Sequence, residues 1–479
     1  MTDSVRPGSY IDGVWRHRRR DDMFTVADPA TTATLAVIEQ SGLGEADAAL
    51  AAADSASGAW ASAPPRVRSD VLRRCYELVS EAADELAAMI VAEAGKRMSD
   101  ARAEVAYAAE FLRWYSEEAV RVPGRFGSLP EGGGTMYVSR RPVGPCLLLT
   151  PWNFPLAMVT RKVAPAVAAG CTAVLKPSEL TPLTCYRFVD LLEAAGLPAG
   201  VLNVVTTTNP GPLVERLLSD PRLRKVSFTG STPVGRTLMR QAAERMLRTS
   251  MELGGDAPLL VLADADPAAA VAGTLVAKFR GSGQACTAAN RILVHSSVAG
   301  EYLDRLAERV IAMRAGTGTD PSSGTGPLIN AAAVARTRRR VEEVLADGAE
   351  LLAQGPTTTG PGCFFPATLI GGVRPDSVVA GVEWFAPVAA VSVFDDEEEL
   401  VAAAASSDSG LASYIFTGDI AKGRRIASRL EVGMTALNTG LLSNAAAPFG
   451  GVKLSGHGRE GGSEGLDEYL ETHYRLEYN

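Results

Sequence analysis

Apolar residues recur at helical spacing in the segment 69–95. The apolar positions of this segment are Val71, Leu72, Cys75, Leu78, Val79, Leu86, Met89 and Ile90. Such spacing places the side chains on one face of an α-helix. Asp70 can cap the start of this helix and Gly95 its end, so the pattern predicts one amphipathic helix over 69–95.

After residue 143 the pattern changes to short, continuous apolar runs separated by helix-like segments. The runs cover residues 146–149, 173–175, 201–205 and 226–228. Continuous apolar strands that alternate with helices are typical of a parallel sheet covered on both faces, where nucleotides bind at the carboxyl ends of the strands. A second alternating region, from 258 to 393, predicts a second α/β domain with strands at 259–262 and 291–295.

Two segments alternate like edge strands and do not fit a doubly wound domain. They are residues 132–141, which begin with three glycines, and residues 472–478. An exposed edge strand has free N–H and C=O groups that invite pairing with another chain unless they are covered. The two segments therefore pair either with another subunit or within the chain, and the sequence favours neither arrangement.

Composition narrows the class of protein. The 479 residues are enough for two large domains. Forty-seven basic and 55 acidic residues give a net charge of -8, which argues against a nucleic-acid partner. The longest uncharged apolar stretch, between Lys162 and Lys176, is shorter than the roughly 20 residues of a membrane helix, and no secretory signal is recognisable. We therefore expect no membrane partner.

The cysteines and histidines argue against a disulfide scaffold and against a metal site. None of the six cysteines forms a C-x-x-C pair, and no two of the four histidines have the spacing of helical metal ligands. A reducing cytoplasm is the simplest location for such a chain.

Cys286 follows a glycine-containing segment, residues 281–285, which lets the backbone approach a ligand closely. A helix starting after Cys286 would place its N-terminus near the sulfur and lower the thiol pKa. For an isolated cysteine, an inert buried thiol is the better interpretation, because free cysteine is among the most buried residue types. The residues around Cys286 reverse that preference.

Two further side chains can support chemistry at a thiol. Glu252 ends an apolar run beside Gly254 and Gly255, where burial would raise its pKa into the range of a general base. Asn153 follows the apolar run 146–149, and its amide can donate a hydrogen bond to a developing oxyanion. The alternatives, a carboxylate that caps a turn and an asparagine that forms one, stay open.

A dinucleotide site is indicated at two predicted strand ends. The segment 228–235 follows a strand and opens a helix, which suits phosphate oxygens, although it is not a G-x-G-x-x-G motif. Lys176, Pro177, Ser178 and Glu179 end another strand, where Lys176 and Glu179 can hold ribose hydroxyls. The Glu179 carboxylate would repel a 2′-phosphate, so we expect NAD to be preferred over NADP.

Seven short motifs together resemble the aldehyde dehydrogenase family along nearly the whole chain. They are PWNFP at 151–155, KPSE at 176–179, FTGS at 228–231, ELGG at 252–255, GQAC at 283–286, EWFAPV at 383–388 and PFGG at 448–451. The resemblance implies two doubly wound parallel-sheet domains with a small β oligomerisation arm. The implied boundaries are 1–122 with 142–252 for dinucleotide binding, 253–456 for catalysis, and 123–141 with 457–479 for the arm.

The resemblance also implies a role for each site residue. Cys286 is the nucleophile that forms a thiohemiacetal and then a thioester, Glu252 is the general base, and Asn153 with the Cys286 N–H is the oxyanion hole. The implied contacts of NAD are Trp152, Asn153, Lys176, Pro177, Ser178, Glu179, Gly230, Ser231, Leu253, Glu383 and Phe385. The resemblance further implies that Lys162 and Glu460 form a proton relay. It also implies that the protein is a homodimer or a homotetramer.

Within the family, segments 156–162 and 437–444 resemble the succinate-semialdehyde dehydrogenase branch. By position, Arg161, Arg280 and Ser443 match the residues with which that branch binds the second carboxylate of its substrate. Two guanidinium groups suit bidentate capture of a carboxylate. The alternative for either arginine is an ion pair with a protein carboxylate, and the alternative substrates are glutarate semialdehyde or an uncharged aldehyde.

Other functions are disfavoured by particular residues. A catalytically idle member would lack Cys286 or Glu252, and a coenzyme A-acylating relative would have no use for a hydrolytic base. A thiol hydrolase would need a histidine beside Cys286, and no motif places one there. The chain departs from the family pattern at Ala288, at Ala386 and at the pair 281–282, which leaves the shape of the aldehyde site open.

Overall fold

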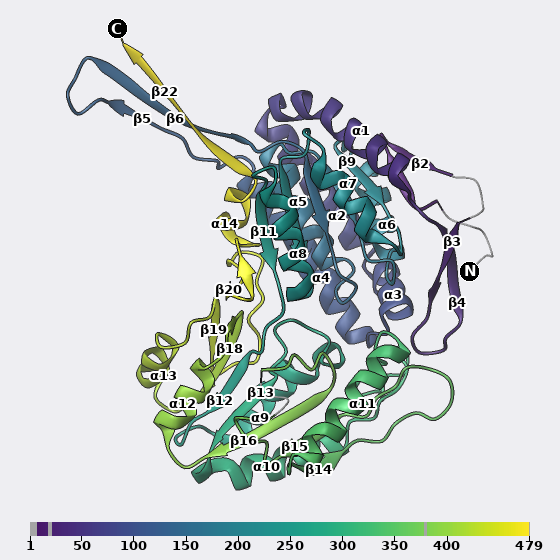
Figure 1. Ribbon diagram of the computed structural model, residues 1–479, viewed down its shortest axis with the longest axis vertical. Helices are drawn as coiled ribbons and strands as arrows, with labels where there is room; N and C mark the ends of the chain where they lie inside the picture. The colour runs from purple at the N-terminus through teal and green to yellow at the C-terminus, as the bar shows by residue number, and fades with distance from the viewer. Residues whose placement is uncertain (1–6, 18–21, 378–380, 479) are drawn as a thin grey trace.

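The computed structural model describes residues 7–17, 22–377 and 381–478 of the chain. These residues form two α/β units, each built on its own sheet, and a narrow β-arm that projects from the first unit (Figure 1). The predicted fold class, two doubly wound parallel-sheet units with a small β-arm, is confirmed. No helix within the described ranges is both long and apolar enough to span a bilayer.

The first sheet has eight strands in the order β2-β1-β9-β8-β7-β10-β11-β21. Strands β9, β8, β7, β10 and β11 are parallel, whereas β1, β2 and β21 pair antiparallel at the two edges. The four predicted apolar runs are all strands, with bounds within one residue of the prediction. The bounds are β1 Ser9–Ile11, β2 Val14–Arg16, β7 Cys146–Leu149, β8 Ala173–Lys176, β9 Leu202–Val205, β10 Lys225–Thr229, β11 Arg248–Glu252 and β21 Gly456–His457.

Successive residues of a strand point to opposite faces of the sheet. Because the strands here are continuously apolar, both faces are covered by helices. Leu147 and Leu149 pack with α1, α7 and α8, whereas Cys146 and Leu148 pack with α2 to α6. These helices are α1 Leu43–Ser62, α2 Pro65–Glu81, α3 Ala83–Ala94, α4 Met98–Glu118, α5 Ala157–Ala169, α6 Leu183–Ala194, α7 Pro210–Ser219, α8 Thr232–Ala243 and α14 Gly462–Asp467.

The predicted single helix over 69–95 is wrong in two respects. The helix begins earlier, at Pro65, whose fixed φ and missing N–H suit a first helical position. The chain then breaks at Ala82, so that α2 and α3 are separate helices. The predicted end is confirmed, since Gly95 adopts the left-handed conformation at φ 71° that a helix C-cap favours.

The second sheet has seven strands in the order β14-β15-β16-β13-β12-β18-β19, all parallel except β14. Helices α9 and α10 cover one face and α11 to α13 the other. The strands are β12 Pro258–Val261, β13 Arg291–His295, β14 Glu350–Gln354, β15 Thr368–Gly371, β16 Val388–Phe394, β18 Ala412–Phe416 and β19 Met434–Leu437. The helices are α9 Pro267–Thr274, α10 Ser296–Ile311, α11 Ala331–Ala346, α12 Glu397–Ala405 and α13 Ile420–Ala427.

The two edge-like segments pair with each other within the chain. Strand β22 (Leu470–Tyr478) lies antiparallel to β6 (Gly134–Pro142), and β5 (Arg125–Ser128) completes the three-stranded arm. Two short strand pairs stand outside the large sheets. They are β3 (Met23–Ala27) with β4 (Thr34–Glu39), and β17 (Ser409–Gly410) with β20 (Val452–Lys453).

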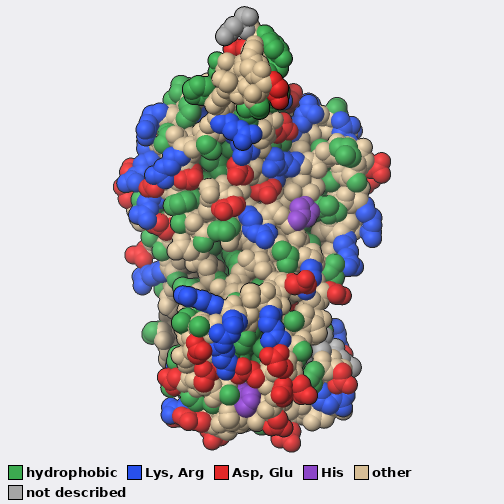
Figure 2. All heavy atoms as spheres, turned by 90° about the vertical axis from the view of Figure 1, so that its left-hand side faces the viewer, with side chains coloured by type: hydrophobic (Ala, Val, Ile, Leu, Met, Phe, Trp, Pro, Cys, Tyr) green, Lys and Arg blue, Asp and Glu red, His purple; other side chains and the backbone are tan. Residues whose placement is uncertain are grey.

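Acidic and basic side chains are interspersed on the face of the molecule that Figure 2 shows.

Candidate active site

Cys286 lies where two cavities meet, between the two α/β units. Among the described residues, only Met158 and Cys286 line both cavities. The first has a volume of about 190 Å³ and is lined mainly by Lys96, Asp100, Glu104, Tyr107, Phe154, Arg161, Arg280, Thr287, Ser443 and Phe449. The second has a volume of about 330 Å³ and is lined mainly by Trp152, Asn153, Gly230, Ser231, Glu252, Leu253, Arg336, Arg340, Glu383 and Phe385. The sulfur is therefore open to ligands from two sides.

The loop before Cys286 is held in an unusual backbone conformation. After α9 the chain makes a π-helical turn and then a 3₁₀ turn, in which Ser282 has a φ of 60°. The Ser282 hydroxyl holds this turn, since it donates to Gly326 O at 3.0 Å and accepts from Gly326 N at 2.9 Å. Gly283 has a φ of 69°, and a Cβ there would lie 2.2 Å from Ala386 O. Only glycine fits this position.

The expected helix after Cys286 is absent, because the chain turns directly into β13. The helix that was expected to follow Cys286 and lower the thiol pKa therefore plays no part here. Burial, reinforced by the nearby Glu252 carboxylate, instead raises the pKa of Cys286 well above its ordinary value. Formation of the thiolate in this arrangement requires a nearby proton acceptor.

Glu252 is placed to accept such a proton. It ends β11 opposite Thr229 of β10, and its side chain is buried. Apart from the Cys286 thiol, no hydrogen-bond donor among the described residues satisfies its carboxylate oxygens. Burial raises the pKa of Glu252 to about 7, although Arg161 opposes the shift. A carboxylate with this pKa is suited to general-base chemistry near neutral pH.

Asn153 lies directly beside the nucleophile loop. Its Nδ2 donates to Gln284 O at 3.0 Å, and its Oδ1 is buried without a partner among the described residues. Gln284 is fixed in turn, because its Oε1 accepts from Ile329 N at 2.9 Å. One amide N–H of Asn153 thus remains for a ligand at the Cys286 sulfur.

The predicted substrate arginines lie in the first cavity, but they differ in their partners. Arg161, in α5, forms an ion pair with buried Glu460 and also lines the first cavity. Lys162 Nζ also donates to Glu460 Oε1 at 2.5 Å and to Ser227 Oγ at 2.9 Å. Burial raises the pKa of Glu460, but Arg161 and Lys162 outweigh it and hold the pKa at about 2. Glu460 is therefore charged and neutralises one of the two cations.

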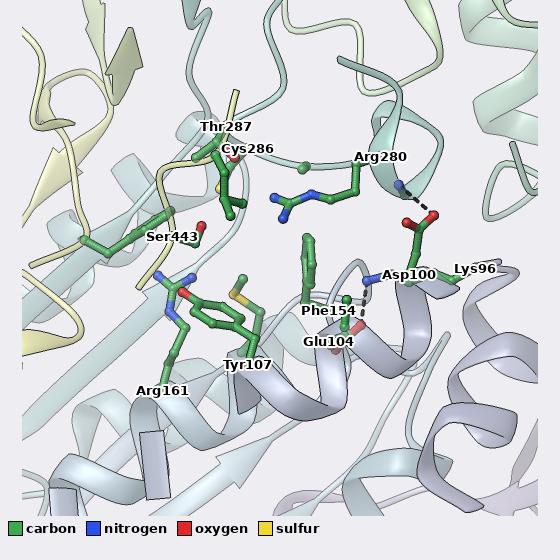
Figure 3. A pocket seen from close by; sticks show the side chains of 16 residues that line it. Lys96, Asp100, Glu104, Tyr107, Phe154, Arg161, Arg280, Cys286, Thr287 and Ser443 are labelled. Atoms are coloured by element: carbon green, nitrogen blue, oxygen red, sulfur yellow. Dashed lines mark hydrogen bonds and ion pairs between the residues drawn. The ribbon is translucent and has the colours of Figure 1, made fainter. Parts of the chain in front are cut away.

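Arg280 has no such partner. Within the described ranges, no aspartate or glutamate lies within ion-pair distance of its guanidinium group, which points into the first cavity beside Cys286 (Figure 3). Ser443 lies on the opposite side of the same space. The structure thus brings the three predicted substrate residues together around one cavity.

The predicted cofactor residues divide into two groups. Trp152, Asn153, Gly230, Ser231, Leu253, Glu383 and Phe385 line the second cavity. The segment from Lys176 to Glu179 does not line it and lies at the end of β8, where Lys176 Nζ pairs with Glu179 at 3.0 Å. The helix predicted after segment 228–231 is confirmed as α8, for which Ser231 is the N-cap.

The residues of the second cavity fit a dinucleotide. The Thr229 hydroxyl and Glu383 Oε1 are buried without hydrogen-bond partners among the described residues, and ligand hydroxyls or amides would satisfy them. The N–H groups at the start of α8 favour phosphate oxygens. Burial, and to a smaller extent repulsion by the Glu252 carboxylate, raises the pKa of Glu383 to about 7.

A buried asparagine joins the two loops that line this cavity. Asn290 Nδ2 donates to Gly255 O at 3.0 Å, and its Oδ1 accepts from Trp384 N at 3.1 Å and from Lys278 Nζ at 3.2 Å. The loop that follows Glu252 and the loop that carries Glu383 are therefore fixed to each other.

Several residues of the cavity walls were not predicted from the sequence. Asp100, Glu104 and Tyr107 come from α4 and Lys96 from the turn before it, and Arg336 and Arg340 come from α11. None belongs to a recognisable motif, and only the packing of α4 against the nucleophile loop brings its side chains to Cys286. The spacing of Arg336 and Arg340, one helical turn apart, was the one available signal, since both project from the same face of a helix.

Comparison with known proteins identifies the family of the chain. The aldehyde dehydrogenase family matches residues 15–474. A succinate-semialdehyde dehydrogenase of Paenarthrobacter nicotinovorans is 52% identical over 90% of this chain and 96% of that protein. A probable succinate-semialdehyde dehydrogenase [NADP(+)] of Sinorhizobium fredii is 43% identical over 94% of this chain and 92% of its own length. A glutarate-semialdehyde dehydrogenase of Pseudomonas aeruginosa is 41% identical over 98% of this chain and 97% of that protein.

Solved structures show the same fold. The crystal structure of a succinate-semialdehyde dehydrogenase from Burkholderia pseudomallei superposes with a TM-score of 0.96 at 42% identity, and the match covers 99% of this chain and 98% of that one. The chain therefore belongs to the aldehyde dehydrogenase family.

Proposed function

We propose that this enzyme oxidises succinate semialdehyde to succinate with NAD as the preferred hydride acceptor. One observation carries the proposal: Arg280 points an unpaired guanidinium group into the cavity that holds the Cys286 thiol. Arg280 is half-buried. A cation without an ion-pair partner at a cavity wall favours an anionic ligand, and a substrate with a carboxylate at one end and an aldehyde at the other satisfies both groups. The names of the similar proteins support the same substrate class.

In the proposed reaction, Glu252 accepts the proton of the Cys286 thiol, and the thiolate attacks the aldehyde carbon to form a thiohemiacetal. Asn153 Nδ2 and the Cys286 N–H donate to the oxygen that becomes negative. NAD, when held along the second cavity, would supply the acceptor for the hydride that leaves this carbon. The product on Cys286 is a thioester.

Hydrolysis then releases the acid. Glu252 first releases the proton that it took from the thiol. It then accepts a proton from a water molecule as the water oxygen attacks the thioester carbon, the C–S bond breaks, and the sulfur regains a proton. Lys162 and Glu460 are proposed to pass protons away from this centre, and their 2.5 Å contact supports that path. The base acts only when it is ionised, so turnover is expected to rise as the pH increases through about 7.

For the cofactor, we infer that Trp152, Gly230, Ser231, Leu253, Glu383 and Phe385 contact the dinucleotide along the second cavity. Lys176, Pro177, Ser178 and Glu179 are assigned to the adenosine ribose, because they end the strand next to β7. The Glu179 carboxylate would repel a 2′-phosphate and so favours NAD. NADP is the second candidate, which the name of the Sinorhizobium fredii relative supports.

We also infer a homodimer or homotetramer in which the β-arm contacts another subunit. Phe126, Tyr474 and Tyr478 are exposed on this arm, and covering such side chains is favourable. The expected domain boundaries stay a prediction. Within segment 457–479, strand β22 is the part that pairs with the arm strand β6. A reducing cytoplasm is proposed because the six cysteines are free.

The substrate is tested by measuring reduced-nicotinamide formation with succinate semialdehyde and with butanal, which has the same number of carbon atoms and no carboxylate. A large preference in kcat/KM for the semialdehyde supports the proposal. Equal or reversed values refute the carboxylate site and leave an uncharged aldehyde as the substrate. Including glutarate semialdehyde tests the second candidate, which the Pseudomonas aeruginosa relative supports.

A further inference from the structure

The distal end of the first cavity contains a buried tyrosine hydroxyl, that of Tyr107. Tyr107 projects from α4, and its hydroxyl lies beside the Arg161 guanidinium group, on the side where Ser443 also points inward (Figure 3). The Oη atom is buried, and apart from the Ser443 side chain it has no hydrogen-bond partner among the described residues. A buried hydroxyl with unused hydrogen-bonding capacity costs free energy, which a bound ligand would recover.

The groups around this hydroxyl are hydrogen-bond donors. Arg161 Nε is buried and has no acceptor among the described residues, and the guanidinium group stacks 4.0 Å above the Phe449 ring, which fixes its plane. Arg280 adds a second, unpaired guanidinium group to the same cavity. Burial raises the pKa of Tyr107, with Arg161 and then Ser443 opposing the rise, so the hydroxyl keeps its proton and can donate it in a hydrogen bond.

We propose that Tyr107 is a substrate-binding residue whose hydroxyl donates a hydrogen bond to the distal carboxylate of the aldehyde substrate, together with Arg280 and Ser443. This inference rests on the proposed function, since it requires a substrate with a second carboxylate. A carboxylate has two oxygens with about four acceptor positions, so it can accept from all three side chains at once.

Tyr107 and Ser443 also separate this cavity from a neighbouring hollow of about 240 Å³, which Trp114 and Asn444 help to line. The two hydroxyls thus stand at the end of the cavity, where a substrate chain must stop. A carboxylate that reaches this wall finds donors, whereas a methyl group at the same place leaves the Tyr107 hydroxyl unsatisfied. The wall therefore selects both the charge and the length of the substrate.

The test is the variant Tyr107→Phe, which removes one oxygen and keeps the ring. We expect kcat/KM for succinate semialdehyde to fall by about 10-fold to 100-fold, mainly through KM, as is typical for loss of a hydrogen bond to a charged group. Inhibition by the product succinate should weaken by a similar factor. The values for butanal should stay within about twofold, because butanal has no group that accepts from Tyr107.

The matched control is Tyr76→Phe, which makes the same chemical change on α2, away from both cavities. It should leave both substrates unaffected. Equal losses with succinate semialdehyde and butanal in Tyr107→Phe, or no loss with either, would overturn the proposal. A failure of the proposed function is seen separately, in the wild-type protein, as the absence of any preference for succinate semialdehyde over butanal.

Discussion

Replacing Glu252 by glutamine is expected to stabilise the folded protein in alkaline solution while it stops turnover. Burial raises the native pKa of this carboxyl to about 7, against the ordinary value of 4.5. A raised carboxyl pKa stabilises the native state below the unfolded pKa, and this contribution is lost as the pH rises from 4.5 through 7. Glutamine does not ionise, so the variant avoids the free-energy cost of a buried charged carboxylate at high pH.

The size of the effect follows from the shift. A difference of roughly 2.5 pH units corresponds to about 3 kcal/mol, most of which develops between pH 5 and pH 8.5. An unfolding entropy of about 2 cal/mol/K per residue gives roughly 1 kcal/mol/K for a chain of this length. We therefore expect the Tm difference between Glu252→Gln and wild type to increase by about 2 to 3 °C between these two pH values.

Thermal unfolding at pH 5 and pH 8.5, at one scan rate, measures this difference. Comparing the two pH values removes any pH-independent cost of placing an amide at the site. Glu81→Gln, at an exposed position in α2, is the matched control and should show no change with pH. A Tm difference for Glu252→Gln that is the same at both pH values, or that becomes more negative at pH 8.5, would refute a buried Glu252 with a raised pKa.

Two further predictions concern the nucleophile loop and the cofactor. In Gly283→Ala, the new Cβ would lie 2.2 Å from Ala386 O at a φ that disfavours alanine. The loop must move, so we expect a destabilisation of about 2 to 4 kcal/mol and a loss of kcat; a Tm and kcat equal to wild type would contradict the loop geometry. In Glu179→Ala, loss of the repelling carboxylate and release of Lys176 should lower KM for NADP by about 10-fold, roughly 1.4 kcal/mol, with little change for NAD. Initial rates with both cofactors measure this, and an unchanged ratio would reject the role of Glu179.

Local patterns predicted the strands well and the helix break poorly. The run 146–149 is buried on both faces of the sheet, so its continuous apolar character reports its environment directly. The break at Ala82 left no trace in the spacing, because Val79 and Leu86 stand seven residues apart and both pack into the same core. Periodicity records which face is buried and does not record where the backbone turns.

The site shows a similar division. Cys286, Glu252 and Asn153 were identified because they lie at strand ends and in loops that bear motifs. The sequence could not predict that Arg161 has an ion-pair partner and Arg280 has none among the described residues. The partner of Arg161 is Glu460, which lies about 300 residues further along the chain, in the loop before α14. Tyr107 was missed for the same reason, because an ordinary helix carries it and only tertiary packing brings it to the thiol.

The two cavities have almost no residues in common, and this separation has a consequence for how such an enzyme can change. Only Met158 and Cys286 belong to both walls among the described residues. Under the proposed function, substitutions in α4 or around Ser443 alter which aldehyde fits and leave the surfaces along β10, β11 and α8 intact. A lineage built on this plan can therefore acquire a new substrate without losing its cofactor, since almost entirely different side chains line the two cavities.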